Sequence, residues 1–459
     1  MLSKSIKYKD VLLLLLAMYR EKIKELECWA AQDNRKPLII RGARQVGKST
    51  LVKIFAKKNG YDLLEINFER NPEYADLFKG NNPSEIINLL EINFETEIKN
   101  STLLFLDEIQ AEPQVLRCLR YFYEELPELP IISAGSLLDF ELNSPSYSIP
   151  VGRITYMYLH PMGFIEFLIA DGKNKLAEFI ESYHIDDDIP EVIHQKLINE
   201  FKIYLVVGGM PEAVKIYTQT KSIGKSEEVK QDLLATFQND FAKYSKNHQY
   251  NLIRKIFAQI SQNIGKKIKY SNLSRENKAA DVANILDLFE AARIIKKVVR
   301  SSANGVPISA EENYKFFKII FLDVGLISTQ LNVGAKILNV GDLLLVNNGE
   351  IAEQWIGQAL LLSTDGNQFP ELHYWAREKR SSSAEVDYVI SNKDNVIPVE
   401  VKAGKTGSLK SMHLFIQEKQ SNLAIRFNSD KPSFHRKEKL LSLPLYLAEQ
   451  TKKIIGNII

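Results

Sequence analysis

The nine residues "GARQVGKST", from Gly42 to Thr50, constrain the architecture of the N-terminal part of this chain more than any other segment. They fit the pattern G-x-x-x-x-G-K-[ST]. The apolar run "PLII" precedes them, and the helical pattern "STLVKIFAKK" overlaps their end. A strand, a glycine-containing loop and a helix in this order predict backbone N–H groups that converge on phosphate oxygens. We expect the loop residues to line this phosphate site: Gly42, Ala43, Arg44, Gln45, Val46, Gly47, Lys48, Ser49 and Thr50.

The side chains after the second glycine predict a nucleotide bound with magnesium. Lys48 is expected to reach the β- and γ-phosphates of ATP, and Ser49 to ligate Mg²⁺. Downstream, "TLLFLDEIQ" runs four apolar residues into Asp107 and Glu108. We expect Asp107 to hold Mg²⁺ through water and Glu108 to orient and deprotonate the attacking water. A solvated strand terminus is the structural alternative for this acid pair.

Polar and basic residues near the next two strands are candidates for sensing nucleotide and stabilising charge. Ser133 or Ser136 in "SAGS" would hydrogen-bond the γ-phosphate, or else cap a helix. Arg153 in "VGRI" is a candidate arginine finger, and Arg44 lies in the phosphate loop; a surface salt bridge is the alternative for both. A finger supplied in trans would require a homo-oligomer. The candidate catalytic residues are therefore Lys48, Glu108 and Arg153.

Short apolar runs alternate with helical patterns around the phosphate loop. The runs are "PLII", "LLEINF", "TLLFLDE" and "LPIISAGS", and the alternation continues through "ITYMYLHPM". This pattern is typical of an α/β fold in which helices cover a parallel sheet. We expect an N-terminal helix (1–35), a P-loop core (36–165), a helical lid (166–240), a basic winged-helix-like region (241–330) and a C-terminal α/β domain (331–459).

Bulk composition argues against a disulfide-stabilised protein and against a membrane-spanning one. Hydrophobic residues make up 45% of the chain and charged residues 25%, as in ordinary globular domains. The two cysteines, Cys28 and Cys118, lie in no metal-ligand or disulfide spacing, which predicts a reducing, cytoplasmic location. The apolar run "VLLLLLAM" at residues 11–18 is too short to span a bilayer, so we expect a docking helix and no membrane partner.

Residues 243–300 concentrate positive charge. They contain thirteen Lys or Arg and four Asp or Glu, whereas the whole chain carries a formal net charge of only +2. Helical spacing persists, and the order short helix, turn, helix, strand is that of a winged helix-turn-helix. The segment predicts contact with the phosphates of nucleic acid, DNA by preference; a solvated charged face is the alternative.

The run "IPVEVKAG" (397–404) carries two charges on one face of an apolar strand. With the upstream run "AEVDYVI", it predicts a hairpin centred between residues 393 and 394, which places Asp387 opposite Glu400 and Glu385 opposite Lys402. Opposed carboxylates repel, and a divalent cation between them would remove the conflict. Glu353, on the preceding helix, would complete a Mg²⁺ or Mn²⁺ site of a nuclease. The alternative is a Glu385–Lys402 salt bridge with Asp387 in solvent.

A set of segments resembles, in order, a large prokaryotic family of AAA-type ATPases with a C-terminal domain of unknown function. The resemblance extends from about residue 35 to about residue 445. It implies a P-loop ATPase, then a winged helix, then a fold of the restriction-endonuclease-like PD-(D/E)xK type. The segments are "RGARQVGKST", "LLFLDEIQ", "SAGSLL", "VGRI" with "LHPMGFIEF", "GGMPEAV", "FLDVGL", "GEIAEQW" and "EVDYVI" with "VIPVEVKAG".

The resemblance also implies roles for single residues. Lys48 and Ser49 match the phosphate loop of the family, and Asp107 and Glu108 match its metal and water residues. Ser136 stands at the sensor position and Arg153 in the Gly-Arg motif. The nuclease-like signature is matched by Glu353, Asp387, Glu400 and Lys402. The helix-turn-helix region is rich in lysine and matches the family pattern only loosely.

The sequence therefore predicts a Mg²⁺-dependent ATPase whose nucleotide state controls a nucleic-acid-binding, nuclease-like C-terminal domain. In the main alternative, that domain has lost catalysis and docks DNA or a protein under nucleotide control. A third alternative, action on another protein as in a defence or toxin system, is left open by the sequence.

Overall fold

The computed structural model describes residues 19–136, 152–243, 250–364, 371–379, 382–402 and 409–458. The apolar run at residues 11–18 and the last two residues of "IPVEVKAG" lie outside this part of the chain. Within it, no helix combines the length and apolar character that a membrane span requires.

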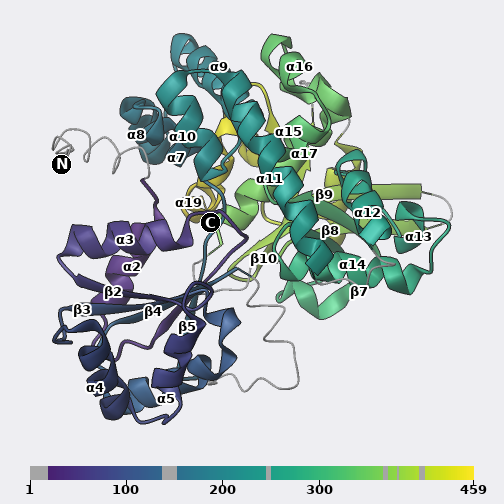
Figure 1. Cartoon of the computed structure of the whole chain (residues 1–459). Coiled ribbons are helices and arrows are strands. Elements are labelled where there is room, and N and C mark those ends of the chain that lie inside the picture. The colour runs from purple at the N-terminus through teal and green to yellow at the C-terminus, as the bar shows by residue number, and fades with distance from the viewer. Residues whose placement is uncertain are drawn as a thin grey trace.

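The N-terminal sheet has five parallel strands in the order β2-β3-β4-β1-β5 (Figure 1). Helices α2 and α3 pack on one face of it and helices α4 and α5 on the other, as the apolar runs predicted. The parallel α/β architecture is thereby confirmed. The elements are α2 (Lys22–Ala30), β1 (Leu38–Arg41), α3 (Lys48–Asn59), β2 (Asp62–Asn67), η1 (Pro72–Phe78), α4 (Pro83–Phe94), β3 (Thr102–Asp107), η2 (Ile109–Ala111), α5 (Pro113–Glu125), β4 (Ile131–Gly135) and β5 (Thr155–Tyr158).

A helical layer follows the first sheet and leads into the basic region. Its face at Val282, Ile285, Leu286 and Phe289 is buried, as the helical spacing predicted. The expected order of short helix, helix and strand is present as α13, α14 and β6. The elements are α7 (Phe164–Ala170), α8 (Asn174–Ser182), α9 (Glu191–Val207), α10 (Pro211–Thr220), α11 (Ile223–Lys243), α12 (Tyr250–Gln262), α13 (Tyr270–Leu273), α14 (Ala279–Ala291), β6 (Ile295–Ser301), η4 (Ile308–Glu311) and β7 (Glu312–Phe321).

The C-terminal sheet is mixed, with eight strands in the order β12-β13-β11-β10-β9-β8-β6-β7. Strands β6 and β7 of the basic region belong to it, so the boundary expected at residue 330 does not separate two sheets. The remaining elements are α15 (Val324–Gln330), α16 (Gly334–Asn339), η5 (Leu343–Gly349), α17 (Glu350–Leu362), β8 (His373–Lys379), β9 (Ser382–Asn392), β10 (Asn395–Val401), α18 (Lys410–Lys419), β11 (Ala424–Asn428), β12 (Ser433–His435), η6 (Arg436–Glu438), β13 (Leu440–Pro444), η7 (Leu445–Gln450) and α19 (Thr451–Gly456).

Two glycine-containing motifs join the helical layer to the C-terminal sheet. The backbone N–H of Gly209, in "GGMPEAV", donates to Asp323 Oδ2 of "FLDVGL" at 2.7 Å. A Cβ atom added at Gly325 would lie 2.5 Å from the Cα of Gly208, closer than any side chain tolerates. These motifs therefore have a packing role, because the two backbones touch where α9 ends and α15 begins.

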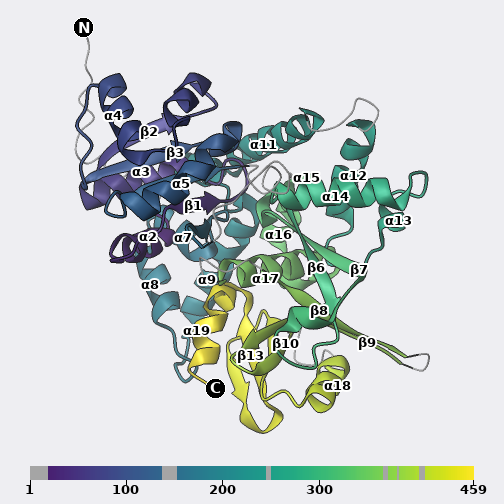
Figure 2. The same ribbon diagram turned by 90° about the horizontal axis from the view of Figure 1, so that it is seen from below.

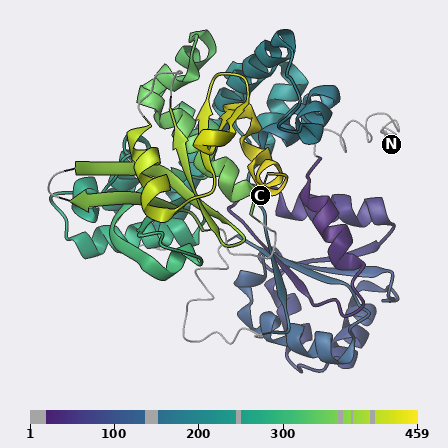
Figure 3. The ribbon, with the colours of Figure 1, turned by 180° about the vertical axis from the view of Figure 1, so that it is seen from behind.

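The C-terminal end of the chain returns to the helical layer. Figures 2 and 3 show α19 between helices α7 to α9 and the C-terminal sheet. The carboxylate of Glu449 accepts the backbone N–H groups of Phe164 and Ile165 at the start of α7. Burial raises the pKa of Glu449 to about 8. The end of the chain thus holds the segment "LHPMGFIEF", which directly follows β5.

Candidate functional site

The phosphate loop connects β1 to α3 in the predicted place. Gly47 precedes the first residue of α3 with φ of 92°, a left-handed conformation that glycine adopts without a Cβ penalty. The buried Lys48 ammonium donates to Gly42 O at 3.1 Å and to Ala43 O at 2.9 Å. These two contacts hold the lysine ammonium inside the curve of the loop.

The first acid of "LDE" lies beside the loop. Ser49 Oγ donates to Asp107 Oδ2 at 2.9 Å, and Asn67 Nδ2 donates to the same oxygen at 3.1 Å. Among described residues, Asp107 Oδ1 is buried with no hydrogen-bond partner. Burial raises the pKa of the Asp107 carboxyl. Asn67 was not predicted, although it ends β2 and pairs with Asp107 in the parallel register, a position from which its amide reaches the acid.

The second acid lies beside a serine from the neighbouring strand. Glu108 has a φ of 51° directly after β3 and accepts from Ser136 Oγ at 3.4 Å. Ser136 follows β4, which lies between β1 and β3, so it faces both the loop and the acids. Ser133 is a buried residue within β4. Of the two predicted serines, Ser136 is therefore the one at the carboxyl edge of the sheet.

The two arginines predicted to act on the nucleotide have different surroundings in the structure. Arg44 forms an ion pair with Asp240 of α11 and donates to Ser136 Oγ at 3.3 Å. Arg153 is exposed and pairs with Glu124 at 2.8 Å, the surface salt bridge that was its alternative role.

Two further arginines near the loop were not predicted. Arg20 donates to Val46 O of the loop at 2.8 Å. The guanidinium of Arg293 lies 4.5 Å from the centroid of the Tyr158 ring at the end of β5. Neither residue belongs to a sequence motif. Arg20 lies before α2, and Arg293 lies in the basic region, far from the loop in sequence.

The hairpin in the C-terminal sheet has the predicted register. Strands β9 and β10 pair antiparallel from Asn392–Asn395 to Tyr388–Val399, which centres the turn between residues 393 and 394. Glu400 is buried and forms an ion pair with Lys402. Burial, followed by the charge of Asp387, raises the pKa of Glu400 to about 7.

A lysine that the sequence did not single out lies among the other carboxylates. Lys318 Nζ is 3.0 Å from Glu353 Oε1, 2.8 Å from Glu385 Oε1 and 3.3 Å from Asp387 Oδ1. We call Lys318, Glu353, Glu385, Asp387 and Glu400 the carboxylate cluster. Within the described residues, no three His, Cys, Asp or Glu side chains are placed to hold a metal ion. In this arrangement, the cluster does not fit the divalent ion that the resemblance implies.

Part of the basic segment forms a patch at the edge of the C-terminal sheet. The ammonium groups of Lys267, Lys269 and Lys315 lie 4.6, 4.7 and 5.7 Å from the centroid of the Phe316 ring. Tyr314, also on the edge strand β7, is 62% exposed. We call these five residues the Phe316 patch. Elsewhere in the segment, several lysines form ion pairs with nearby acids: Lys255 with Glu276, Lys266 with Glu350, and Lys297 with Asp287.

Comparison with protein families finds matches for three segments of the chain. Residues 34–168 match the family model described as AAA domain. Two further segments, residues 198–337 and 348–446, match models each described as a domain of unknown function (DUF8612 and DUF4143). The first of these begins within α9 and includes β6 and β7, although these strands hydrogen-bond within the C-terminal sheet. A comparison with curated proteins found no match.

Several solved structures are similar to parts of the chain. A Walker-type ATPase of Pyrococcus abyssi is 17% identical with a TM-score of 0.42, over 68% of this chain and 95% of that one. The Aeropyrum pernix ORC1 protein in complex with DNA is 10% identical with a TM-score of 0.31, over 69% and 94%. AMPPCP-bound DnaA from Aquifex aeolicus is 18% identical with a TM-score of 0.27, over 60% and 87%. These scores are too low to carry an inference about function.

The lysine of the AAA domain predicts a pH dependence of ATP binding. Burial lowers the pKa of Lys48 to about 8, and the charges of Arg44 and Arg293 act in the same direction, against Glu108 and Asp107. Below pH 8 the ammonium is charged, whereas above it ATP binding must take up a proton. We expect the Kd for ATP to rise above this pH, by at most about tenfold per pH unit. Titrations in buffers of different ionisation enthalpy measure this proton uptake.

The matched control for this pH dependence is Lys48→Arg, whose guanidinium stays charged throughout the range. The Kd of this variant for ATP should not change with pH, whatever its value relative to the wild type. A wild-type Kd that stays flat between about pH 7 and 9.5 would contradict the assigned environment of Lys48.

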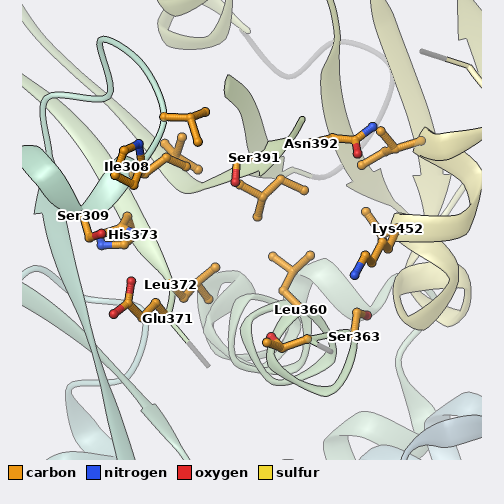
Figure 4. A pocket seen from close by; sticks show the side chains of 17 residues that line it. Ile308, Ser309, Leu360, Ser363, Glu371, Leu372, His373, Ser391, Asn392 and Lys452 are labelled. Atoms are coloured by element: carbon orange, nitrogen blue, oxygen red, sulfur yellow. The ribbon is translucent and has the colours of Figure 1, made fainter. Parts of the chain in front are cut away.

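A cavity of about 300 Å³ lies apart from the AAA domain, between α17, α19 and the strands β8 and β9. Ile308, Ser309 and His373 lie on one side of it and Asn392 and Lys452 on the other (Figure 4). His373 Nε2 is 2.6 Å from Glu312 Oε1, so this polar group of the wall is satisfied within the protein. The described residues that line the cavity form no reactive constellation.

Proposed function

We propose that this protein binds and hydrolyses ATP with Mg²⁺, and that its nucleotide state controls the C-terminal sheet. One observation carries this proposal: Lys48 and Ser49, the first two residues of α3, lie with Asp107 at the carboxyl edge of a parallel sheet. The positive N-terminal end of a helix and a buried lysine both stabilise a bound phosphate. Oxygen atoms of carboxylate and hydroxyl groups are suitable ligands for Mg²⁺. The AAA-domain match over residues 34–168 supports the same class.

The residues present fit a magnesium ion. Asp107 Oδ1 is buried without a hydrogen-bond partner in the described chain, and Oδ2 accepts from Ser49 Oγ, the predicted hydroxyl ligand. When bound, Mg²⁺ would neutralise charge on the β- and γ-phosphate oxygens. Glu108, linked to Ser136, would orient and deprotonate the attacking water, and Lys48 would hold the phosphates.

The contacts around the phosphate loop suggest how the nucleotide state would reach the rest of the chain. Arg44 joins the loop to α11 through Asp240. Arg293 stands between α14 and β6, the strand that pairs with β7 and β8, and its charge acts on Lys48. A phosphate that draws Arg44 or Arg293 inward would pull on elements of the C-terminal half. Arg153 at the surface suits a finger supplied in trans, so the proposal includes a homo-oligomer.

We further propose that the C-terminal half contacts nucleic acid and that the protein is cytoplasmic. The Phe316 patch combines three ammonium groups with aromatic rings, which suits phosphates and unstacked bases of a single strand. Its competing explanation is protection of an edge strand from aggregation by lysine. The described cysteines are free, as in a reducing compartment.

Charge reversal of the patch tests the nucleic-acid contact. The variant K267E/K269E/K315E should bind single-stranded DNA more weakly and lower the slope of log affinity against log salt by about two, because each lost phosphate contact on a single strand removes about 0.7. ATP turnover measured with and without DNA should show stimulation in the wild type and none in the variant. The control K215E/K225E changes exposed lysines on α10 and α11. Equal losses in both variants would point to general charge rather than to the patch.

A second candidate for the output is docking without cleavage, and the position of Lys318 favours it. A nuclease of the predicted type needs a metal among Glu353, Asp387 and Glu400, whereas the structure places an ammonium beside two of them. The two candidates differ in one result. Mn²⁺-dependent cleavage of DNA or RNA that Glu400→Ala abolishes, with ATP hydrolysis retained, would support the nuclease. Intact substrates with the wild type would support docking.

A further inference from the structure

The carboxylate cluster brings acids from three elements together with the ammonium group of a fourth. Lys318 comes from β7, Glu353 from α17, Glu385 and Asp387 from β9, and Glu400 from β10. Strands β6 and β8 lie between β7 and β9 in the sheet, and the Lys318 ammonium lies 5.6 Å from the centroid of the Tyr374 ring of β8. The lysine is only 2% exposed. A buried charge of this kind persists only when acids surround it.

Several of the oxygens that a metal would need are already engaged by protein donors, whereas Glu400 Oε2 is buried with no hydrogen-bond partner among the described residues. Asp387 Oδ1 lies 3.3 Å from Lys318 Nζ, and Asp387 Oδ2 accepts the backbone N–H of Val401 at 2.9 Å. Glu400 Oε1 is paired with Lys402. Burial lowers the pKa of Lys318, but the charges of Glu353, Asp387 and Glu385 outweigh it and hold this pKa well above its usual value. Three carboxylate oxygens within 3.3 Å of the ammonium thus favour its charged form.

We propose that the Lys318 ammonium is the permanent cation of the carboxylate cluster, and that the cluster takes neither Mg²⁺ nor Mn²⁺. This inference deepens the docking form of the proposed function. A lysine tethered to β7 removes the repulsion between carboxylates that a metal would otherwise relieve. It supplies neither the Lewis acidity nor the metal-bound hydroxide of a nuclease. The ion pairs of the cluster thus hold β7, α17 and β9 together. The C-terminal domain would keep a nuclease-like fold but would not cleave nucleic acid.

The first test measures Mn²⁺ binding to the full chain without nucleotide, by electron paramagnetic resonance of free Mn²⁺. The wild type and Asp387→Asn should take up the same amount of Mn²⁺, because the cluster contributes no site. A saturable wild-type site that Asp387→Asn removes would overturn the proposal. Since no nucleotide is present, this failure would leave ATP hydrolysis at the phosphate loop untouched.

The second test removes the internal cation. Lys318→Met leaves buried carboxylates uncompensated, so its thermal midpoint should fall by several degrees and recover when Mn²⁺ is added, with one additional Mn²⁺ bound per chain. The control Lys315→Met, exposed on the same strand, should show neither change. A folded Lys318→Met protein that binds no additional Mn²⁺ would overturn the idea that the lysine occupies the cation position.

Two further variants cover the case in which Lys318→Met does not fold. Lys318→Arg keeps the positive charge, and the double variant K318M/E385Q removes the lysine together with one acid. We expect Lys318→Arg to bind no additional Mn²⁺ and K318M/E385Q to regain a folded, Mn²⁺-binding state. Mn²⁺ uptake by Lys318→Arg equal to that of K318M/E385Q would contradict the proposal, because charge at this position would then make no difference.

Discussion

Replacing Lys48 with alanine is expected to lower the ATP turnover rate about 10²- to 10³-fold or more. The ammonium is buried in the curve of the phosphate loop, where it contacts the carbonyls of Gly42 and Ala43. Charge develops on the phosphate oxygens during transfer, and a preorganised cation in a site of low dielectric constant stabilises it more than water does. The measurement is steady-state phosphate release with Mg²⁺ and saturating ATP.

The matched control for this variant lies on the same helix. Lys57→Ala removes an exposed lysine in the last turn of α3 and should leave turnover within about twofold. Circular dichroism and thermal unfolding establish that both variants are folded. Unchanged hydrolysis in a folded Lys48→Ala protein would refute the assigned site, because another lysine would then have to serve the phosphates.

A large loss of stability is expected from Gly325→Ala, at about 3 kcal/mol of unfolding free energy. The new methyl carbon would lie 2.5 Å from the Cα of Gly208 and 2.7 Å from the O of Val207, both backbone atoms that no rotamer change can move. The contact must open, which would also stretch the hydrogen bond from Gly209 N to Asp323. Urea unfolding followed by tryptophan fluorescence measures the loss.

Gly341→Ala is the control for this stability prediction, because a Cβ atom there would meet no heavy atom within 4 Å. Its unfolding midpoint should stay close to that of the wild type or rise slightly, since alanine reduces the entropy of the unfolded chain. If Gly325→Ala were as stable as Gly341→Ala, the contact between the ends of α9 and α15 would not be tight in solution.

Much of the architecture could be predicted from the sequence, since the signals are local. Alternating apolar runs predict the strands of the first sheet. The run before "LDE" predicts that its two acids lie at the end of a strand. The register of β9 and β10 follows from a turn of fixed length, and it is confirmed from Asn395–Asn392 to Val399–Tyr388. The proposed roles of Lys48, Ser49, Asp107, Glu108 and Ser136 stay predictions, although the structure brings these residues together.

Other parts of both sites could not be predicted, because they depend on which strands become neighbours. Asn67 reaches Asp107 only because β2 pairs with β3. The predicted Arg153 pairs with Glu124 on the surface, whereas Arg20 and Arg293 approach the loop from segments with no motif.

The sequence by itself determined the phosphate loop, the parallel α/β class and the hairpin that carries Asp387 and Glu400, because these depend on tight turns and on the two-residue period of a strand. Only the tertiary structure decided which cation these carboxylates receive. Two strands of the sheet separate Lys318 from Asp387. The Lys318 ammonium reaches Asp387 at 3.3 Å only because β7 is added as the edge strand on this side of the sheet. Long-range strand order sets that contact, and no local pattern encodes it.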